Sequence, residues 1–171
     1  MKAGQFKTPA LAGLLFVVLI GCDDGQNAGS DGFRRSYTDA RAALETGKYD
    51  KANRIYARMM QEAGPLRTRI QLEYAHSLLR SGAYDEAAQQ ARALSQGQTG
   101  TARSAALSVL GTAYHEMGLT ALTGGDPAVG RQYLTQAQTA FAEVLKNDPE
   151  LDPLGALAGR QASIAVQLKA L

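Results

Sequence analysis

Few residues in this chain are of types that catalyse reactions or hold metals, and their spacing matches no catalytic motif. The sequence has two histidines, His76 and His115, and one cysteine, Cys22. A His-Glu pair at 115–116 begins like the zinc motif of metalloproteases, but Leu119 stands where the second histidine ligand belongs. The sequence also lacks a nucleophile elbow, a phosphate-binding loop and an EF-hand loop. We therefore expect no catalytic site, no metal site and no cofactor, and we interpret both histidines as groove or surface residues.

A second pattern is a set of basic residues at helical spacing. Arg34 and Arg41 are seven residues apart, and Arg69, His76 and Arg80 follow at separations of seven and four, so each group shares one helix face. Arginine binds carboxylates through a forked pair of hydrogen bonds, which indicates an acidic partner. The other interpretation is that these arginines are solvated and pair with acidic residues of the same chain, namely Asp39, Glu45 and Glu73.

The N-terminus has the organisation of a secretory signal. Lys2 and Lys7 form a short positive region, and an apolar run follows at residues 11–20. This run is too short to span a bilayer, which needs roughly 20 residues. Leu19-Ile20-Gly21-Cys22 resembles the bacterial lipobox, which implies that residues 1–21 are removed and that Cys22 carries a diacylglyceryl thioether and an amide-linked acyl chain. The alternative is an ordinary signal peptide that ends in a chance cysteine.

The residues after Cys22 bear on location. In enteric bacteria an aspartate at this position resembles the signal for inner-membrane retention, so Asp23 favours the inner membrane over the outer, with the protein facing the periplasm. Residues 22–32 are polar and glycine-rich, which predicts a lipidated cysteine and flexible tether before a folded domain at 33–171. Without Lys2 and Lys7 the chain has 16 basic and 16 acidic residues. This neutrality gives no argument for nucleic acid or for an anionic membrane surface.

Helical patterns joined by glycine turns make up the rest of the chain. Gly47-Lys48-Tyr49-Asp50-Lys51-Ala52 recurs 35 positions later as Gly82-Ala83-Tyr84-Asp85-Glu86-Ala87. Glycine ends the first helix because it adopts the left-handed conformation without strain. Small residues seven positions before each glycine, Ala40 and Ala75, allow the two helices to approach closely. We therefore predict one helical hairpin at 33–63 and a second from 66 to a loop at 97–100.

The third unit departs from this pattern. It is expected to open with Thr101 as an N-cap, and its first helix is predicted to continue past Gly118 to a break at Gly124-Gly125. Asp126-Pro127 then predicts the start of a long second helix, which ends at 147–149. A final helix from Asp152-Pro153 is expected to cap the stack. Its apolar side consists of Leu154, Leu157, Ile164, Leu168 and Leu171.

These motifs resemble the tetratricopeptide repeat family. Leu110-Gly111-x-x-Tyr114-x-x-x-Gly118 looks like the first-helix motif of that family, and Ala137-x-x-x-Phe141-x-x-Val144-Leu145-x-x-x-Pro149 looks like its second-helix motif. The resemblance covers residues 33–171 and implies an all-α superhelix of about three hairpins plus a C-terminal capping helix. An insertion of about 14 residues between Gly118 and Ala137 departs from the family and predicts a longer third hairpin. The alternative is a non-repeating helical bundle.

In tetratricopeptide arrays the first helices line a concave groove that binds partner segments. The resemblance therefore implies a protein-binding groove that consists of Arg34, Tyr37, Arg41, Arg69, Leu72, His76, Arg80, Thr112 and His115, with Glu45, Ser108 and Glu116 on the same stripe. We expect a membrane-anchored, non-enzymatic scaffold or assembly factor for an unidentified protein of the cell envelope, with His76 adding affinity as the pH falls towards 6. The other hypothesis is a structural lipoprotein that self-associates through an apolar outer or C-terminal helix face.

The lipidation hypothesis predicts the behaviour of Cys22→Ala. This variant is expected to accumulate as an unprocessed or soluble species, because the acyl chains provide the membrane anchor. Metabolic labelling with a fatty acid, followed by fractionation, measures both effects. Label retained on the Cys22→Ala protein would contradict the assignment.

Overall fold

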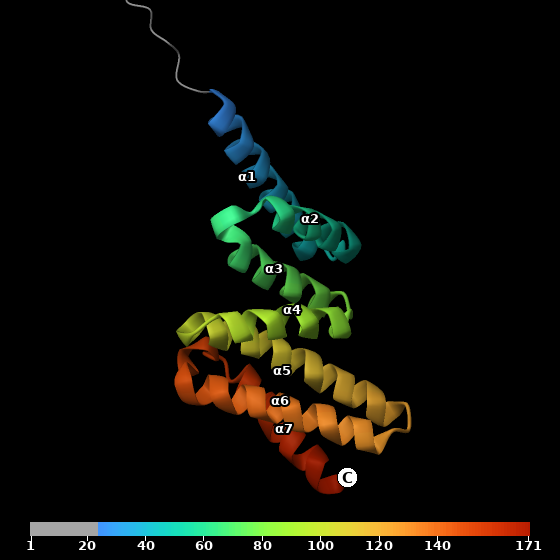
Figure 1. The fold of residues 1–171 in the computed structure, drawn as a ribbon. Helices are drawn as coiled ribbons and strands as arrows, with labels where there is room; N and C mark the ends of the chain where they lie inside the picture. The colour runs from blue at the N-terminus through green and yellow to red at the C-terminus, as the bar shows by residue number, and fades with distance from the viewer. Residues whose placement is uncertain (1–23) are drawn as a thin grey trace, which may run out of the picture.

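The computed structural model describes residues 24–171, with side chains from residue 30 onwards; the predicted signal and Cys22 lie outside the described residues. The described part is all-helical, which confirms the expected all-α class (Figure 1). Each helix packs mainly against the next one in the chain, so the helices form a series of sequence-adjacent pairs. Among the described residues, no helix combines the length and apolar character needed to cross a membrane.

The first two helix pairs are hairpins whose turns lie at the predicted glycines. Helices α1 (Asp24–Glu45) and α2 (Tyr49–Glu62) form the first pair, and α3 (Arg67–Arg80) and α4 (Tyr84–Gly97) form the second. The turn glycines Gly47 and Gly82 have φ angles of 72° and 81°. This left-handed backbone explains why glycine occupies both turns. The 3-10 turn η1 (Gly64–Leu66) connects the hairpins at the predicted Gly-Pro break.

The third pair is longer, as the insertion predicts. Helix α5 (Gly100–Thr123) passes Gly118 without interruption, and α6 (Pro127–Asn147) returns beside it. The Asp126 side chain caps α6 by accepting a hydrogen bond from the Val129 backbone N–H at 3.0 Å. The 3-10 turn η2 (Pro149–Leu151) then leads to α7 (Ala156–Ala170), which packs on α6 and ends the stack.

The helix starts differ from prediction in three places. Helix α1 begins at Asp24, nine residues before the predicted start at Phe33. Residues 24–32 contain no proline, and a helix already nucleated by packed residues gains one hydrogen bond for each residue it adds. Helix α5 begins at Gly100 with Thr99 as its N-cap, because the Thr101 hydroxyl instead donates to Asp148 at 2.7 Å.

Helix α7 begins at Ala156, after the predicted start at Asp152. The Asp152 carboxylate still caps it, accepting hydrogen bonds from the backbone N–H groups of Leu157 and Ala158 at 2.9 Å each. The intervening turn carries Leu154 into solvent, where it is 93% exposed, so its predicted place on the packed side is wrong. Ile164 is fully buried as expected.

Small residues lie where the helices cross. Ala40 and Ala52 are fully buried in the core of the first hairpin, and Ala75 and Ala87 are fully buried in the larger core that continues into the third. In the third pair, a Cβ added at Gly111 would lie 2.7 Å from Cε1 of Phe141. The backbones therefore approach more closely than larger side chains permit.

Overpacking one crossing should destabilise the fold. Ala87→Leu is expected to lower the free energy of unfolding by about 1–3 kcal/mol, since the added carbons have no space. Ala93→Leu is the matched control, because Ala93 lies in the same helix but is exposed. Urea denaturation of both variants measures the difference in their free energies of unfolding. Equal midpoints would show that the space at the helix crossing does not limit the size of residue 87.

Candidate functional site

The exposed side of α1 and α3 contains the first part of the predicted groove, and Glu73 is its central acidic residue. The Tyr37 hydroxyl donates to Glu73 Oε1 at 3.1 Å, and Arg41 Nη1 donates to Glu73 Oε2 at 3.1 Å. Arg41 also lies 3.4 Å from Glu45. Its hydrogen bond and charge interaction with Glu73 raise the pKa of Arg41. Acidic residues of the same chain therefore neutralise Arg41, as the alternative interpretation of the sequence proposed.

Arg69 and Arg80 have different surroundings on the same side of α3. The Arg69 guanidinium lies over the Tyr37 ring at 5.7 Å, and the Arg80 guanidinium lies over the Tyr49 ring at 5.8 Å. Among residues 30–171, neither arginine takes part in a salt bridge. Arg80 Nη2 also donates to the Tyr49 hydroxyl at 3.4 Å. Stacking on an aromatic ring orients a guanidinium and leaves its remaining N–H groups available to a ligand.

An apolar recess lies beside Arg69. It has a volume of about 260 Å³ and lies between the N-terminal part of α1 and the start of α3. Phe33, Leu66 and Ile70 contribute apolar surface, and Leu66 is 46% exposed. The remaining lining residues are Arg34, Tyr37, Thr38 and Arg69. Sequence reasoning missed the roles of Phe33 and Leu66; the signal available was an apolar residue directly after the Gly64-Pro65 break.

Two further groove residues on α3 are less accessible than predicted. Leu72 is half-buried and packs against the main core. His76 is half-buried, and its burial together with the nearby positive charge of Arg80 lowers its pKa from the ordinary value. Glu73 opposes this effect, whereas Arg41 adds to it. These surroundings make His76 gain charge less readily as the pH falls than the sequence argument expected.

The third hairpin does not continue the open face. His115 is only 6% exposed, so it is not the surface residue that the sequence indicated. Helix α7 covers it: Arg160 Nη1 lies 2.9 Å from His115 Nδ1 and 2.8 Å from Glu116 Oε1. The Thr112 hydroxyl donates to the Ser108 carbonyl at 2.8 Å within the same helix. The open part of the predicted groove thus belongs to the first two hairpins.

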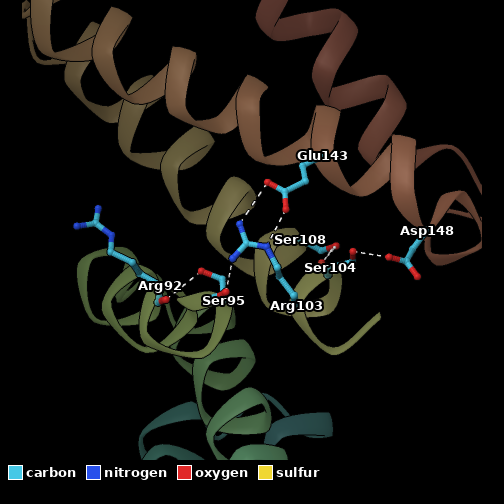
Figure 2. Close-up of polar contacts among 7 residues, drawn as sticks. All are labelled: Arg92, Ser95, Arg103, Ser104, Ser108, Glu143 and Asp148. Carbon is cyan, nitrogen blue, oxygen red and sulfur yellow. Dashed lines mark hydrogen bonds and ion pairs between the residues drawn. The ribbon is translucent and has the colours of Figure 1, made fainter. Parts of the chain in front are cut away.

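A separate polar network joins α4, α5 and α6 (Figure 2). The Arg103 guanidinium forms a two-point ion pair with Glu143, with Nε to Oε1 at 2.7 Å and Nη2 to Oε2 at 3.3 Å. The same guanidinium donates to the Ser95 carbonyl at the end of α4. One side chain therefore connects three helices, and its hydrogen-bonding groups are used within the fold.

Asp148 ends α6 beside this network. Its carboxylate accepts a hydrogen bond from the hydroxyl of Ser104 on α5 (Figure 2). It accepts another from the hydroxyl of Thr101, and Asp148 is buried. These hydrogen bonds lower the pKa of Asp148 below its ordinary value. An open hollow of about 370 Å³ lies nearby, between α4 and α6, where Arg92 stacks at 5.6 Å on the Tyr114 ring. We interpret these contacts as structural links between the second and third hairpins.

The described residues thus form a helical protein in which Arg69 and Arg80 lie on one face of α3 and an apolar recess lies beside Arg69. Among residues 30–171, no group of three or more His, Cys, Asp or Glu side chains is arranged to hold a metal ion. Comparison of the chain with protein families, with curated proteins and with solved structures finds no match.

The Asp148 network predicts an acid-dependent contribution to stability. Because its pKa is lowered in the folded state, Asp148 stabilises the fold fully above its ordinary pKa, and this contribution is lost as the pH falls through the folded-state pKa. Asp148→Asn is expected to lower the Tm at pH 7 and to weaken the dependence of Tm on pH between about 5 and 2. Glu150→Gln, an exposed carboxylate in the next turn, is the control. If the Tm of Asp148→Asn and of the unaltered protein fell equally between about pH 5 and 2, Asp148 would not be the source of the acid-dependent stability.

Proposed function

We propose that this chain is a periplasm-facing lipoprotein whose tetratricopeptide-like helical array binds an acidic segment of a partner protein. The binding residues lie on α1 and α3. The observation that carries the proposal is the combination of two arginines without a carboxylate partner among residues 30–171, Arg69 and Arg80, with an apolar recess next to Arg69. Recessed apolar surface with a few oriented polar groups is the usual form of a binding site.

The array-like fold is supported by local features that recur. Both short hairpins turn at a glycine with positive φ and bury an alanine on either side of the turn. In each, the residue after the glycine bonds back to a carbonyl near the end of the first helix: Lys48 N–H to Ala43 O at 2.8 Å, and Ala83 N–H to Leu78 O at 3.0 Å. Equivalent turns followed by equivalent crossings favour a repeated unit over an irregular bundle.

Charge is unevenly distributed along the array. Residues 30–80 contain ten Lys and Arg but only six Asp and Glu, whereas residues 81–171 contain six basic and eight acidic residues. The equal numbers of basic and acidic residues over 22–171 conceal this difference. A positive face attracts and orients an acidic partner, and the attraction weakens as salt screens it. The charge distribution thus favours a partner segment rich in Asp and Glu.

The recess limits what else that segment contains. At about 260 Å³ it is smaller than the roughly 300–1,000 Å³ of sites that hold drug-sized molecules. Its size suits a single aromatic or aliphatic side chain. We therefore propose a segment with one such side chain next to carboxylates: the apolar group enters between Phe33 and Leu66, and the carboxylates reach Arg69 and Arg80.

Exposed apolar residues near the C-terminus support the alternative function, and they include Leu171, whose predicted place on the packed side of the last helix is wrong. Val166 is 69% exposed and Leu171 is 41% exposed, so apolar surface remains uncovered at the C-terminal end. Self-association through this surface predicts a dimer or larger species that is insensitive to salt. Size-exclusion chromatography with light scattering distinguishes it from a monomer that binds other proteins.

The arginine pair provides the central test. Arg69→Gln combined with Arg80→Gln is expected to weaken binding of an acidic peptide that contains one aromatic residue by about tenfold, or about 1.4 kcal/mol, because two charge-assisted contacts are lost. The Tm is expected to change little, since exposed charges contribute little to folding. Fluorescence anisotropy with labelled peptides at low and high salt measures the affinity, and crosslinking in the native envelope identifies the physiological partner.

The matched control removes the same charge elsewhere. Arg54 and Arg58 are exposed on α2, so Arg54→Gln combined with Arg58→Gln lowers the net charge equally without touching the proposed face. Equal weakening by both double variants would mean that binding follows net charge alone. No weakening by the Arg69 and Arg80 variant would place the binding site elsewhere.

A further inference from the structure

Arg160 of helix α7 contacts α5 through the side chains of His115 and Glu116. Arg160 Nη1 lies 2.9 Å from His115 Nδ1 and also donates to Glu116 Oε1 at 2.8 Å. A guanidinium can only donate hydrogen bonds, so His115 Nδ1 must be the acceptor. The neutral imidazole therefore carries its proton on Nε2. This arrangement exists only while His115 is uncharged.

The other side of the imidazole also faces α7. His115 Nε2 is buried, and the side chain of Gln167 interacts with this histidine. Neither Nε2 nor the buried Gln167 Oε1 has a hydrogen-bond partner of ordinary geometry among the described residues. Nε2 carries a proton in both the neutral and the charged imidazole, so the interaction with Gln167 persists in either state and favours the charged one. Only the contact with Arg160, at one position of α7, depends on His115 being neutral.

The remaining attachment of α7 is limited. Ile164 is fully buried, while Leu157 and Leu168 are half-buried against the main core. Arg131 of α6 adds a hydrogen bond to the Leu168 carbonyl at 3.4 Å. A C-terminal helix that packs mainly on one neighbouring helix, here α6, with a single fully buried side chain can open without unfolding the rest of the protein.

We propose that α7 is an acid-released cover over α5, with His115 as its trigger. Protonation places an N–H on Nδ1 opposite the Arg160 N–H groups, so a hydrogen bond is replaced by a contact between two donors and two positive charges. The charged and polar side chains that face His115 are Arg160, Glu116 and Gln167. Glu116 is already paired with Arg160 and offsets only part of the repulsion. Release of α7 uncovers the side of α5 that bears His115, one of the predicted groove residues. This inference does not depend on the proposed binding function.

The direction of the pH effect follows from the same contacts. Burial, and then the charge of Arg160, lower the pKa of His115, while Glu116 and Gln167 oppose the shift. Docking of α7 is therefore fully stabilised above the ordinary histidine pKa of about 6.5 and weakens as the pH falls below it. Each unit by which docking lowers this pKa changes the docking equilibrium by as much as tenfold.

Hydrogen exchange of the full chain tests the proposal. Protection factors, which correct for the pH dependence of intrinsic exchange, are compared at pH 7.5 and 5.0. We expect the amides of α7 to lose protection about three- to tenfold at pH 5.0, while those of α5 and α6 change little. His115→Gln supplies an acceptor for Arg160 and a donor for Gln167 but cannot titrate, so its α7 protection should be independent of pH. His76→Gln is the matched control and should retain the pH response of the unaltered protein.

Several results would overturn the inference. These are constant α7 protection in the unaltered protein, loss of the pH response in His76→Gln, or an undiminished response in His115→Gln. Should His115→Gln fail to fold, NMR titration of the unaltered protein tests the same proposal. The spectrum of His76→Gln lacks the His76 signals and therefore assigns those of His115. We expect His115 to titrate below about 6.5 together with the α7 resonances. Titration of His115 with the ordinary histidine pKa while α7 stays docked would refute the proposal that protonation of His115 releases α7.

Discussion

Close approach of helix backbones is the constraint on which the rest of this structure depends. At each crossing the space is filled by an alanine or a glycine, and in the third hairpin by glycines that leave no space for even one more carbon. Gly130 is the tightest example, since a Cβ there would lie 2.5 Å from Cδ2 of Leu122. Pairs that approach so closely exclude water from their contact, and the turn glycines permit the short connections that close contact requires.

The longer third hairpin changes how the helices are held together. Helices α5 and α6 pack along much of their length, whereas α4 is shorter and reaches only part of them. Polar side chains supply contacts at these edges: Arg103 joins α4, α5 and α6, and Asp148 holds the end of α6 to the start of α5. Charged groups arranged in this way specify which helix ends lie together, because a buried or half-buried charge without its partner is costly.

Similar residues have different roles along the same predicted stripe because their neighbours differ. Arg41 lies within reach of Glu73 and is neutralised, whereas Arg69 and Arg80 lie over tyrosine rings and keep their charge available. His76 and His115 are both shielded from water, but only His115 contacts another helix through its ring nitrogen. An exposed pair of arginines and a contact between helices thus arise from one sequence pattern, and the packing of α7 separates them.

The sequence determined the local structure of this protein. Glycine and proline positions located the turns at 47, 64–65, 82 and 124–125, and helical periodicity identified the buried faces that pack there, because both effects act within a few residues of the chain. Only the tertiary structure decided the start of α1, the exposure of Leu154, and the recess between Phe33 and Leu66, since each depends on packing between segments. Only packing, too, decided which arginines are neutralised and that Arg160, 45 residues from His115 in the chain, covers it. Periodicity shows which residues share a helix face but not which other helix lies against that face, because that choice depends on the volumes and charges of residues far apart in the sequence.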